Sequence, residues 1–476
     1  MRAKLLSFSE YAATLLPHET AYLLEIQQFE DPAKLAILER LHQNCIQIHQ
    51  VAPYDQSIDK RKYSNLKTWI SDRLRENDVD AQFEWMNDME LKTMTDSIEP
   101  EEEKSILRAI RKIGPTHFFF IKFYELVQTF RHFLLIRLRY EEHRQANDFL
   151  HKNRQAYERS KNTYEQLHEA TLDIVGQYST GSGESMQWQK WLAEVLHDDR
   201  LDGLNRYLAL IRLIFVHLNY GSLAPLLQHF EYMDALFTNG TYYSKRLLIN
   251  YYSQRLLFHS KSKDYEKAIY YGYLSVRGKN SDYLHYLNNL ASVLMRAKRH
   301  QEALQVMKSA YADVKTTRNF HSKIGFVAFY IKCLNHNQQF KNAEGYANAF
   351  LKAYKKEIFE YRWHLFFTSY LDALFQQRKY GRVTSLVQQY RLLQKDKEYQ
   401  KKASYLPVIP WYYEMAAYKE SGQGLHPLSN RICDYMLSLP QNSEKLHQIR
   451  EFLQEVKDHI PEAHQLIQAK WHEKKR

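Results

Sequence analysis

A short motif that recurs four times between residues 247 and 390 constrains the fold more than any other feature of this chain. Each copy has an aromatic residue or His, two variable residues, and then a small or β-branched residue. Each follows an apolar run with helical spacing and a short polar turn, and a second such run comes after it. The steps between copies are 35, 40 and 40 residues. The pattern predicts consecutive helical hairpins, and its four copies are Tyr265–Ala268, His300–Ala303, Phe340–Ala343 and Tyr380–Val383.

Turn-forming residues are scarce along the whole chain. The 476 residues include only 14 Gly and 11 Pro, whereas average usage of the two together is about 12%. Sheets and loop-rich enzymes need many turn residues, so this scarcity favours long helices with short connections. We therefore expect an all-α fold, namely an α-α superhelix built as a helical-hairpin solenoid, with an additional N-terminal helical region that contains a long helix.

Breaks in the helical pattern separate four predicted parts of the chain. The dipeptide Gly114-Pro115 ends an N-terminal helical region, and no Gly or Pro follows it before Gly176. Because nothing interrupts that stretch, a long helix is predicted there. The expected parts are an N-terminal helical region over 1–115, the long helix over 116–180, hairpin repeats over 186–400 and a C-terminal helical cap over 401–476.

The long helix has two different halves. Residues 118–138 are apolar on most sides, which predicts burial, and the interruption of this run by charges rules out a membrane span. The half from 139 to 169 is polar, with a thin apolar stripe in steps of three, four or seven residues. Two interpretations stay open for it: a coiled-coil arm for dimerisation, or an antiparallel hairpin that packs on neighbouring helices.

The glycine-rich stretch 176–185 is predicted to be a linker. Its Gly176 and Gly181 have the spacing of a phosphate loop. However, Ser182 and Gly183 stand where that loop needs Lys and then Ser or Thr, and no strand is expected before it. A domain boundary is therefore the better interpretation.

The best copy of the repeat, residues 286–310, resembles a tetratricopeptide repeat. Residues at the positions that the motif requires are Leu287, Leu290, Ala291, Leu294, Ala303 and Ala310. The small residues among them let two helices approach closely. The other copies match less well, and their 40-residue steps exceed the usual ~34, which predicts helices longer by about one turn.

The resemblance implies that first-helix positions line a concave groove that binds a partner. Some members of the family hold a peptide carboxylate with paired Lys and Asn at such positions. Here those pairs are Asn288 with Ser292 and Ala328 with Lys332, so this clamp is absent. The groove residues that the resemblance implies are Asn250, Ser253, Gln254, Asn288, Asn289, Ser292, Arg296, Lys332 and His336.

Charge is unevenly distributed around a net value of +11. Residues 321–404 carry a strong basic excess, and residues 76–103 carry an acidic one. The basic excess has three interpretations: an ordinary solvated face, a site for an acidic protein segment (including residues 76–103 of this chain), or a site for a nucleic-acid backbone. We select Lys355, Lys356, Arg378 and Lys379 as the residues of this candidate basic face.

Catalytic and metal-binding motifs are missing from the sequence. It contains no HExxH, no GxSxG, no phosphate loop and no paired-Cys motif. His42, Cys45 and His49 share one helical face and could ligate a metal, but one helix rarely completes such a site, so packing is the preferred interpretation. We expect no catalytic residue, no cofactor and no metal.

The three cysteines are odd in number and widely spaced, which indicates a reducing compartment, and no apolar leader is present. We therefore expect a cytoplasmic chain with no membrane association. The expected function is a non-catalytic scaffold that binds a protein or peptide in the groove, and an acidic segment is one candidate partner. The alternative is a regulator that binds nucleic acid through residues 321–404. The oligomeric state is left open.

Overall fold

The chain is entirely helical over the residues that the computed structural model describes, which are 5–180, 184–402, 405–422, 424–439 and 443–474. This confirms the predicted all-α class. No strand occurs in these ranges. The chain divides into two compact units: one comprises residues 1–177 and 182–286, and the other comprises 178–181 and 287–476. Part of the linker predicted over 176–185 lies outside the described residues.

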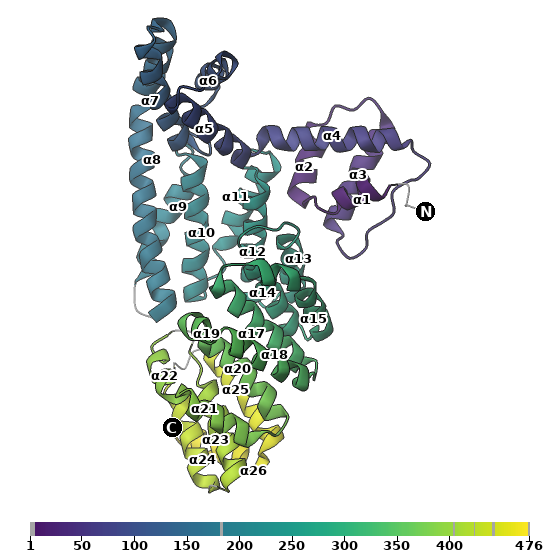
Figure 1. The fold of residues 1–476 in the computed structure, drawn as a ribbon, viewed down its shortest axis with the longest axis vertical. Helices are drawn as coiled ribbons and strands as arrows, with labels where there is room; N and C mark the ends of the chain where they lie inside the picture. The colour runs from purple at the N-terminus through teal and green to yellow at the C-terminus, as the bar shows by residue number, and fades with distance from the viewer. Residues whose placement is uncertain (1–4, 181–183, 403–404, 423, 440–442, 475–476) are drawn as a thin grey trace. The chain divides into compact units, whose positions relative to one another are not determined.

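The helices of the first unit begin with three N-terminal helices and include the longest helix of the chain (Figure 1). They are α1 (Leu6–Ala12), α2 (Pro17–Ile26), α3 (Pro32–Ile46), α4 (Lys60–Asn77), α5 (Val79–Met94), α6 (Pro100–Lys112), α7 (Phe120–Ile136), α8 (Tyr140–Thr180), α9 (Gln189–His197), α10 (Gly203–Tyr220), α11 (Leu226–Thr238), α12 (Lys245–Lys261) and α13 (Tyr265–Ser275), with a 3₁₀ turn η1 (Ser185–Trp188) before α9.

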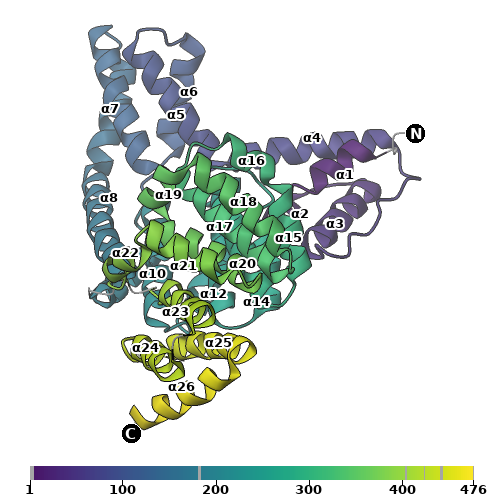
Figure 2. The same ribbon diagram turned by 60° about the horizontal axis from the view of Figure 1, so that its bottom comes forward.

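The second unit consists of hairpins that pack on one another in chain order (Figure 2). Its helices are α14 (Tyr283–Arg296, which begins in the first unit), α15 (His300–Ser309), α16 (Tyr311–Thr316), α17 (Phe320–His336), α18 (Phe340–Ala353), α19 (Lys355–Tyr361), α20 (Trp363–Gln376), α21 (Tyr380–Gln389), α22 (Leu392–Tyr399), α23 (Val408–Ser421), α24 (Leu425–Leu437), α25 (Ser443–His459) and α26 (Pro461–Lys474).

The uninterrupted helix predicted over 116–180 is a hairpin of α7 and α8. The break is at Leu138, which has a φ of 58°. The apolar half then folds back on the polar half: the Tyr124 ring stacks on Tyr157 at 4.1 Å between centroids, and the Tyr124 hydroxyl donates to the Leu150 carbonyl at 3.0 Å. Burial of the α7 aromatics against α8 explains why the hairpin forms, which was one of the two interpretations left open.

The four sequence motifs mark the starts of helices, as predicted. Helices α13, α15, α18 and α21 begin at Tyr265, His300, Phe340 and Tyr380. The small or β-branched residue three positions later is fully buried in every copy, which lets the paired helices approach closely: Ala268, Ala303, Ala343 and Val383.

The prediction that 40-residue steps lengthen the helices by a turn was incomplete. Much of the added length forms short third helices, α16, α19 and α22, which follow the hairpins. Each short helix buries one apolar side chain, namely Val314, Ile358 or Leu392. This burial favours a separate short helix over an extension that would carry those side chains into solvent.

One turn geometry joins the two helices of the four hairpins that carry the motif, namely α12–α13, α14–α15, α17–α18 and α20–α21. The residue two positions before the second helix has a left-handed backbone, with φ between 58° and 61° in Lys263, Lys298, Gln338 and Arg378. The next residue donates its N–H to the carbonyl five positions back, as Gln339 does to Leu334 at 2.9 Å. This bond satisfies a carbonyl that the end of the first helix would otherwise leave unpaired. The α7–α8 turn at Leu138 has the same pattern.

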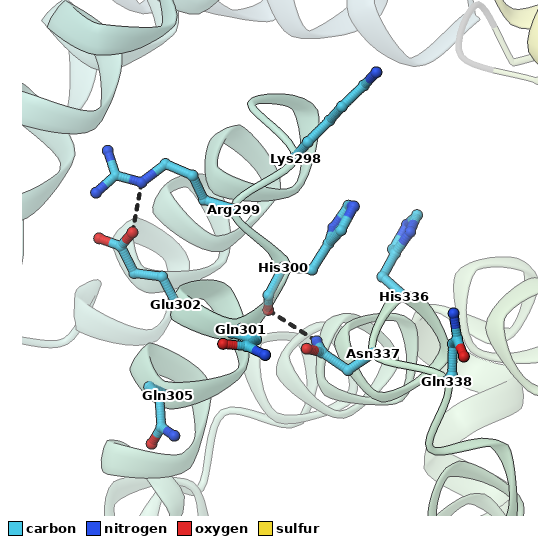
Figure 3. A pocket seen from close by; sticks show the side chains of 9 residues that line it. All are labelled: Lys298, Arg299, His300, Gln301, Glu302, Gln305, His336, Asn337 and Gln338. Atoms are coloured by element: carbon cyan, nitrogen blue, oxygen red, sulfur yellow. Dashed lines mark hydrogen bonds and ion pairs between the residues drawn. The ribbon is translucent and has the colours of Figure 1, made fainter.

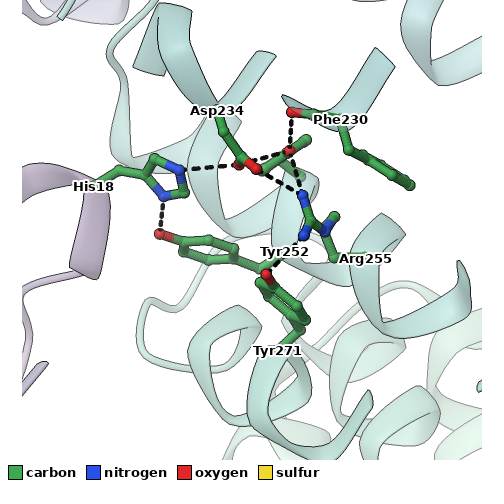
Figure 4. Close-up of polar contacts among 7 residues, drawn as sticks. His18, Phe230, Asp234, Tyr252, Arg255 and Tyr271 are labelled. Atoms are coloured by element: carbon green, nitrogen blue, oxygen red, sulfur yellow. Dashed lines mark hydrogen bonds and ion pairs between the residues drawn. The ribbon is translucent and has the colours of Figure 1, made fainter. Parts of the chain in front are cut away.

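A partly buried polar network connects the N-terminal helix α2 to later helices of the first unit (Figure 4). The imidazole of His18 on α2 lies 2.6 Å from the Tyr252 hydroxyl and 3.0 Å from Asp234 Oδ1. Arg255 donates to Asp234 Oδ2 at 2.8 Å and to the Tyr271 hydroxyl at 2.8 Å. Charge-assisted bonds of this kind are costly to break once buried, so α2 is fixed against α11, α12 and α13.

Replacement of the left-handed residue by Gly tests this turn geometry. Gln338→Gly should raise the free energy of unfolding by about 0.5–1 kcal/mol, because Gly adopts a positive φ without the steric cost that a Cβ adds. Gln339→Gly is the matched control: its φ is −90°, so Gly there only adds freedom to the unfolded chain and should destabilise by a similar amount. Urea denaturation of both variants measures the difference, and equal losses of stability would contradict the assignment.

Candidate functional site

The hairpin register brings polar first-helix residues of the second unit together. Eight positions before each motif, the sequence has Ser292, Lys332 and Asp372, at successive steps of 40 residues. Helices α17 and α20 pack directly on each other, and so do α20 and α23. Side chains at equivalent positions are therefore neighbours on adjacent first helices.

Two carboxylates lie at the centre of this arrangement. The amide nitrogen of Gln376 donates to Glu455 Oε1 at 3.1 Å and to Asp372 Oδ1 at 3.3 Å. The Tyr412 hydroxyl donates to Glu455 Oε1 at 2.8 Å. Asn335 Nδ2 donates to Asp372 Oδ2 at 2.8 Å. We name Lys332, Asp372, Gln376, Tyr412 and Glu455 the central cluster; it is built from α17, α20, α23 and α25.

The electrostatics of the central cluster favour a shared proton. Burial and, second to it, the charge of Asp372 raise the pKa of Glu455 to about 8. Burial also raises the pKa of Asp372, although hydrogen bonds from Gln376, Asn335 and Tyr412 oppose the rise. Ionisation of both carboxylates would place two negative charges beside one shared donor group, which is unfavourable in free energy. The pair therefore retains one proton near neutral pH.

Water reaches the side chains of the cluster. The Lys332 side chain is exposed, and Asp372 and Glu455 are half-buried. Burial by surrounding protein lowers the pKa of Lys332, and the charge of Asp372 only partly offsets that effect. Since these side chains keep part of their surface exposed, they can accept a hydrogen-bond donor or a cationic group from another molecule.

A polar pocket of about 830 Å³ lies where the turns of two hairpins meet (Figure 3). The rings of His300 and His336 stack in it, with centroids 4.8 Å apart and planes at 2°. Asn337 donates to the His300 carbonyl at 2.8 Å, which ties the two turns together. We name this the turn pocket, and its lining residues are Lys298, Arg299, His300, Gln301, Glu302, Gln305, His336, Asn337 and Gln338.

The predicted groove residues fall into both units. In the first unit, the Asn250 side chain accepts from the Tyr207 hydroxyl at 2.7 Å and donates to Tyr286 at 3.1 Å, and Ser253 and Gln254 are buried. These three residues stabilise the helix packing. Since interior packing already occupies them, they are poorly placed to contact a partner.

The second unit holds the remaining predicted groove residues. Asn288 is only 5% exposed, Asn289 and Ser292 are half-buried, and Arg296, Lys332 and His336 are exposed. Lys332 belongs to the central cluster and His336 to the turn pocket. Of the predicted set, Arg296, Lys332 and His336 are the exposed residues, which solvent and a partner can reach.

The candidate basic face is divided into two pairs. Lys355 and Lys356 lie on α19, beside the start of α20, whereas Arg378 and Lys379 follow its end. A helix of 14 residues separates the pairs by roughly 20 Å. Lys379 also forms an ion pair with Glu344, and the Lys355 ammonium lies 5.2 Å from the Tyr390 ring centroid.

Acids in the segment 76–103 form ion pairs inside the first unit. Asp80 contacts Arg246 at 2.6 Å, Asp96 contacts Arg137 at 2.6 Å, and Lys92 bridges Asp88 and Glu102. These partners neutralise much of the acidic excess that the sequence suggested as a docking segment for 321–404.

The three residues considered as metal ligands have other neighbours. His42 Nδ1 lies 2.8 Å from the Thr20 hydroxyl, Cys45 is buried with its thiol 3.5 Å from the Leu15 carbonyl, and the His49 ring lies 5.4 Å from that of Tyr273. In the described part of the chain, no group of three or more His, Cys, Asp or Glu side chains is arranged to hold a metal. Nor is any described helix apolar over a length that would cross a bilayer.

The sequence analysis missed most of the central cluster. Asp372 and Gln376 stand 40 residues after Lys332 and His336, so extension of the repeat register by one copy would have found them. Tyr412 and Glu455 lie beyond the recognised repeats, on helices whose register the sequence does not reveal. Comparison of the chain with protein-family models, with curated proteins and with solved structures gave no match.

The raised pKa of Glu455 predicts a specific pH dependence. The native state keeps this proton up to about pH 8, whereas the unfolded chain releases it near pH 4.3. The stabilisation is therefore complete at low pH and is lost as pH rises through 8. In urea denaturation between about pH 6.5 and 9, Glu455→Gln should flatten the fall in unfolding free energy, and the exposed control Glu398→Gln should not. If the unfolding free energy changed with pH at the same rate in the natural chain, Glu455→Gln and Glu398→Gln, the raised pKa of Glu455 would be refuted.

Proposed function

We propose that the chain is a non-catalytic scaffold whose second unit binds a segment of another protein across its first helices. The central cluster is the observation that supports this proposal most strongly. It places an ammonium group and two carboxylates close together and partly exposed, on helices that otherwise bury apolar side chains. Charges of both signs in one cluster suit a partner segment with complementary charges.

Energetics favour a binding role for the cluster over a structural one. A carboxylate loses several kcal/mol of hydration on burial, and packed apolar residues usually stabilise a fold as well or better. The pair Asp372 and Glu455 also repel each other, as the raised pKa of Glu455 indicates. A cationic group from a partner would displace the shared proton and relieve this repulsion, so the partner segment is expected to place Lys, Arg or an amino terminus there.

The tetratricopeptide-like architecture remains part of the proposal. The buried small residue of each motif, the identical turns and the packing of successive first helices support a superhelix of such hairpins. In that architecture the first helices line the concave side, and this would place the central cluster in the groove that the sequence predicted.

Nucleic-acid binding is the less favoured function. It needs a continuous basic surface, whereas the selected cations form two separate pairs, and carboxylates lie between first helices of the same unit. A protein segment with mixed charge fits these positions better.

Site-specific cross-linking tests the proposal. A photoreactive amino acid at Ser292, in cells that naturally express the chain, should capture a defined segment of a partner protein. Charge reversal by Glu455→Lys should lower the yield about tenfold or more, because it places a like charge opposite the cationic group. Glu398→Lys, on the exposed face of α22, is the matched control and should leave the yield unchanged. Capture that Glu455→Lys does not alter, or no captured protein, would contradict the proposal.

A further inference from the structure

The turn pocket is rich in hydrogen-bond donors and has almost no uncompensated acid. Its single carboxylate, Glu302, accepts from Arg299 Nε at 2.5 Å, so these two charges largely cancel. Lys298 is exposed and forms no ion pair within the described residues. The side-chain amides of Gln301, Gln305 and Gln338 complete the lining. What remains is a cavity with one ammonium group, two imidazoles and several amides.

Two stacked imidazoles add ring nitrogens to this pocket. His300 Nδ1 is shielded from solvent and has no hydrogen-bond partner in the described part of the chain. Burial, followed by the charges of Lys332 and His300, lowers the pKa of His336 to about 4. An anion in the pocket would favour the charged form of His336 and raise its pKa.

The size and position of the pocket limit the kind of anion. A volume of about 830 Å³ exceeds what a single carboxylate fills, and a phosphate monoester has three acceptor oxygens for the available donors. A nucleic-acid strand would bring further phosphates along the same first helices toward Asp372 and Glu455, where like charges repel. A single phosphate on a protein segment avoids that repulsion.

We propose that the turn pocket binds the phosphate group of a phosphorylated side chain in the partner segment, with Lys298 as the principal cation and His300 and His336 as donors. This inference rests on the proposed function, since the segment that crosses the central cluster would carry the phosphate. It makes binding of the partner dependent on a modification of that partner.

The test uses the full chain with ¹³C-labelled histidine rings, titrated with O-phospho-L-serine at constant ionic strength. His336→Gln assigns the signal. Phosphoserine should cause a saturable shift and raise the pKa of His336 by at least about 1, as a nearby opposite charge does. L-serine and L-aspartate should cause neither effect. Lys298→Gln should weaken binding about tenfold, which corresponds to loss of one charge-assisted bond. Lys308→Gln, at the far end of α15, is the matched control and should bind normally.

Four results would overturn the inference. Equal shifts with serine and phosphoserine would show that the pocket does not recognise phosphate, and equal shifts with aspartate would show a general anion site. Tighter binding of a short oligothymidylate, lost in Lys298→Gln, would assign the pocket to nucleic acid instead. If phosphoserine fails while cross-linking at Ser292 still depends on Glu455, the pocket assignment is wrong and the proposed function stands.

Discussion

The left-handed turn between paired helices is the constraint on which the second unit depends. It reverses the chain within three residues, closes the end of the first helix with a backbone hydrogen bond and starts the second helix at a fixed position. Because the four hairpins that carry the motif all use it, their first helices pack in the same register. The residues that occupy it, Lys263, Lys298, Gln338 and Arg378, are all non-glycine, so the surrounding packing must hold each of them in a costly conformation.

Because the register of the hairpins is constant, the spacing of residues in the sequence determines which side chains are neighbours on the surface. Residues 40 positions apart become neighbours, which is how Lys332 and Asp372 reach the same cluster. His300, at the start of α15, and His336, at the end of α17, come to stack because their hairpin turns are adjacent. Most side chains that pack between the helices are apolar or small. The central cluster lies on the first helices, and the turn pocket lies at the hairpin turns beside the start of α15. The two proposals assign a cationic group of the partner to the cluster and a phosphate to the pocket.

The sequence predicts the fold class and the helix starts because both follow from local patterns. Tyr265, His300, Phe340 and Tyr380 each begin a helix, since an apolar period followed by a polar turn is a local signal. The break at Leu138 was not predictable in the same way: no Gly or Pro marks it, and only the burial of the α7 aromatics against α8 determines it. The division into two units near residue 286 likewise depends on packing.

The candidate site was predictable only where the repeat is recognisable. Lys332 and His336 were found through the register of the best copy, and Asp372 was within reach of the same reasoning. Glu455 was not, because α25 comes from outside the repeats and its carboxylate reaches the cluster only through tertiary contacts with Gln376 and Tyr412. The predicted basic face shows a different limit of sequence reasoning. Charges that are close in sequence, such as Lys356 and Arg378, were grouped into one face, but the length of α20 separates them.

The central claim is that the carboxylate pair serves binding and contributes nothing to stability. The double variant Asp372→Leu with Glu455→Met tests it most directly, because it replaces both charges with apolar side chains of similar size. Urea denaturation at neutral pH should give an unfolding free energy equal to that of the natural chain, or higher by about 1–3 kcal/mol. A loss of about 3 kcal/mol or more would show that the pair is a structural element, and would contradict the account.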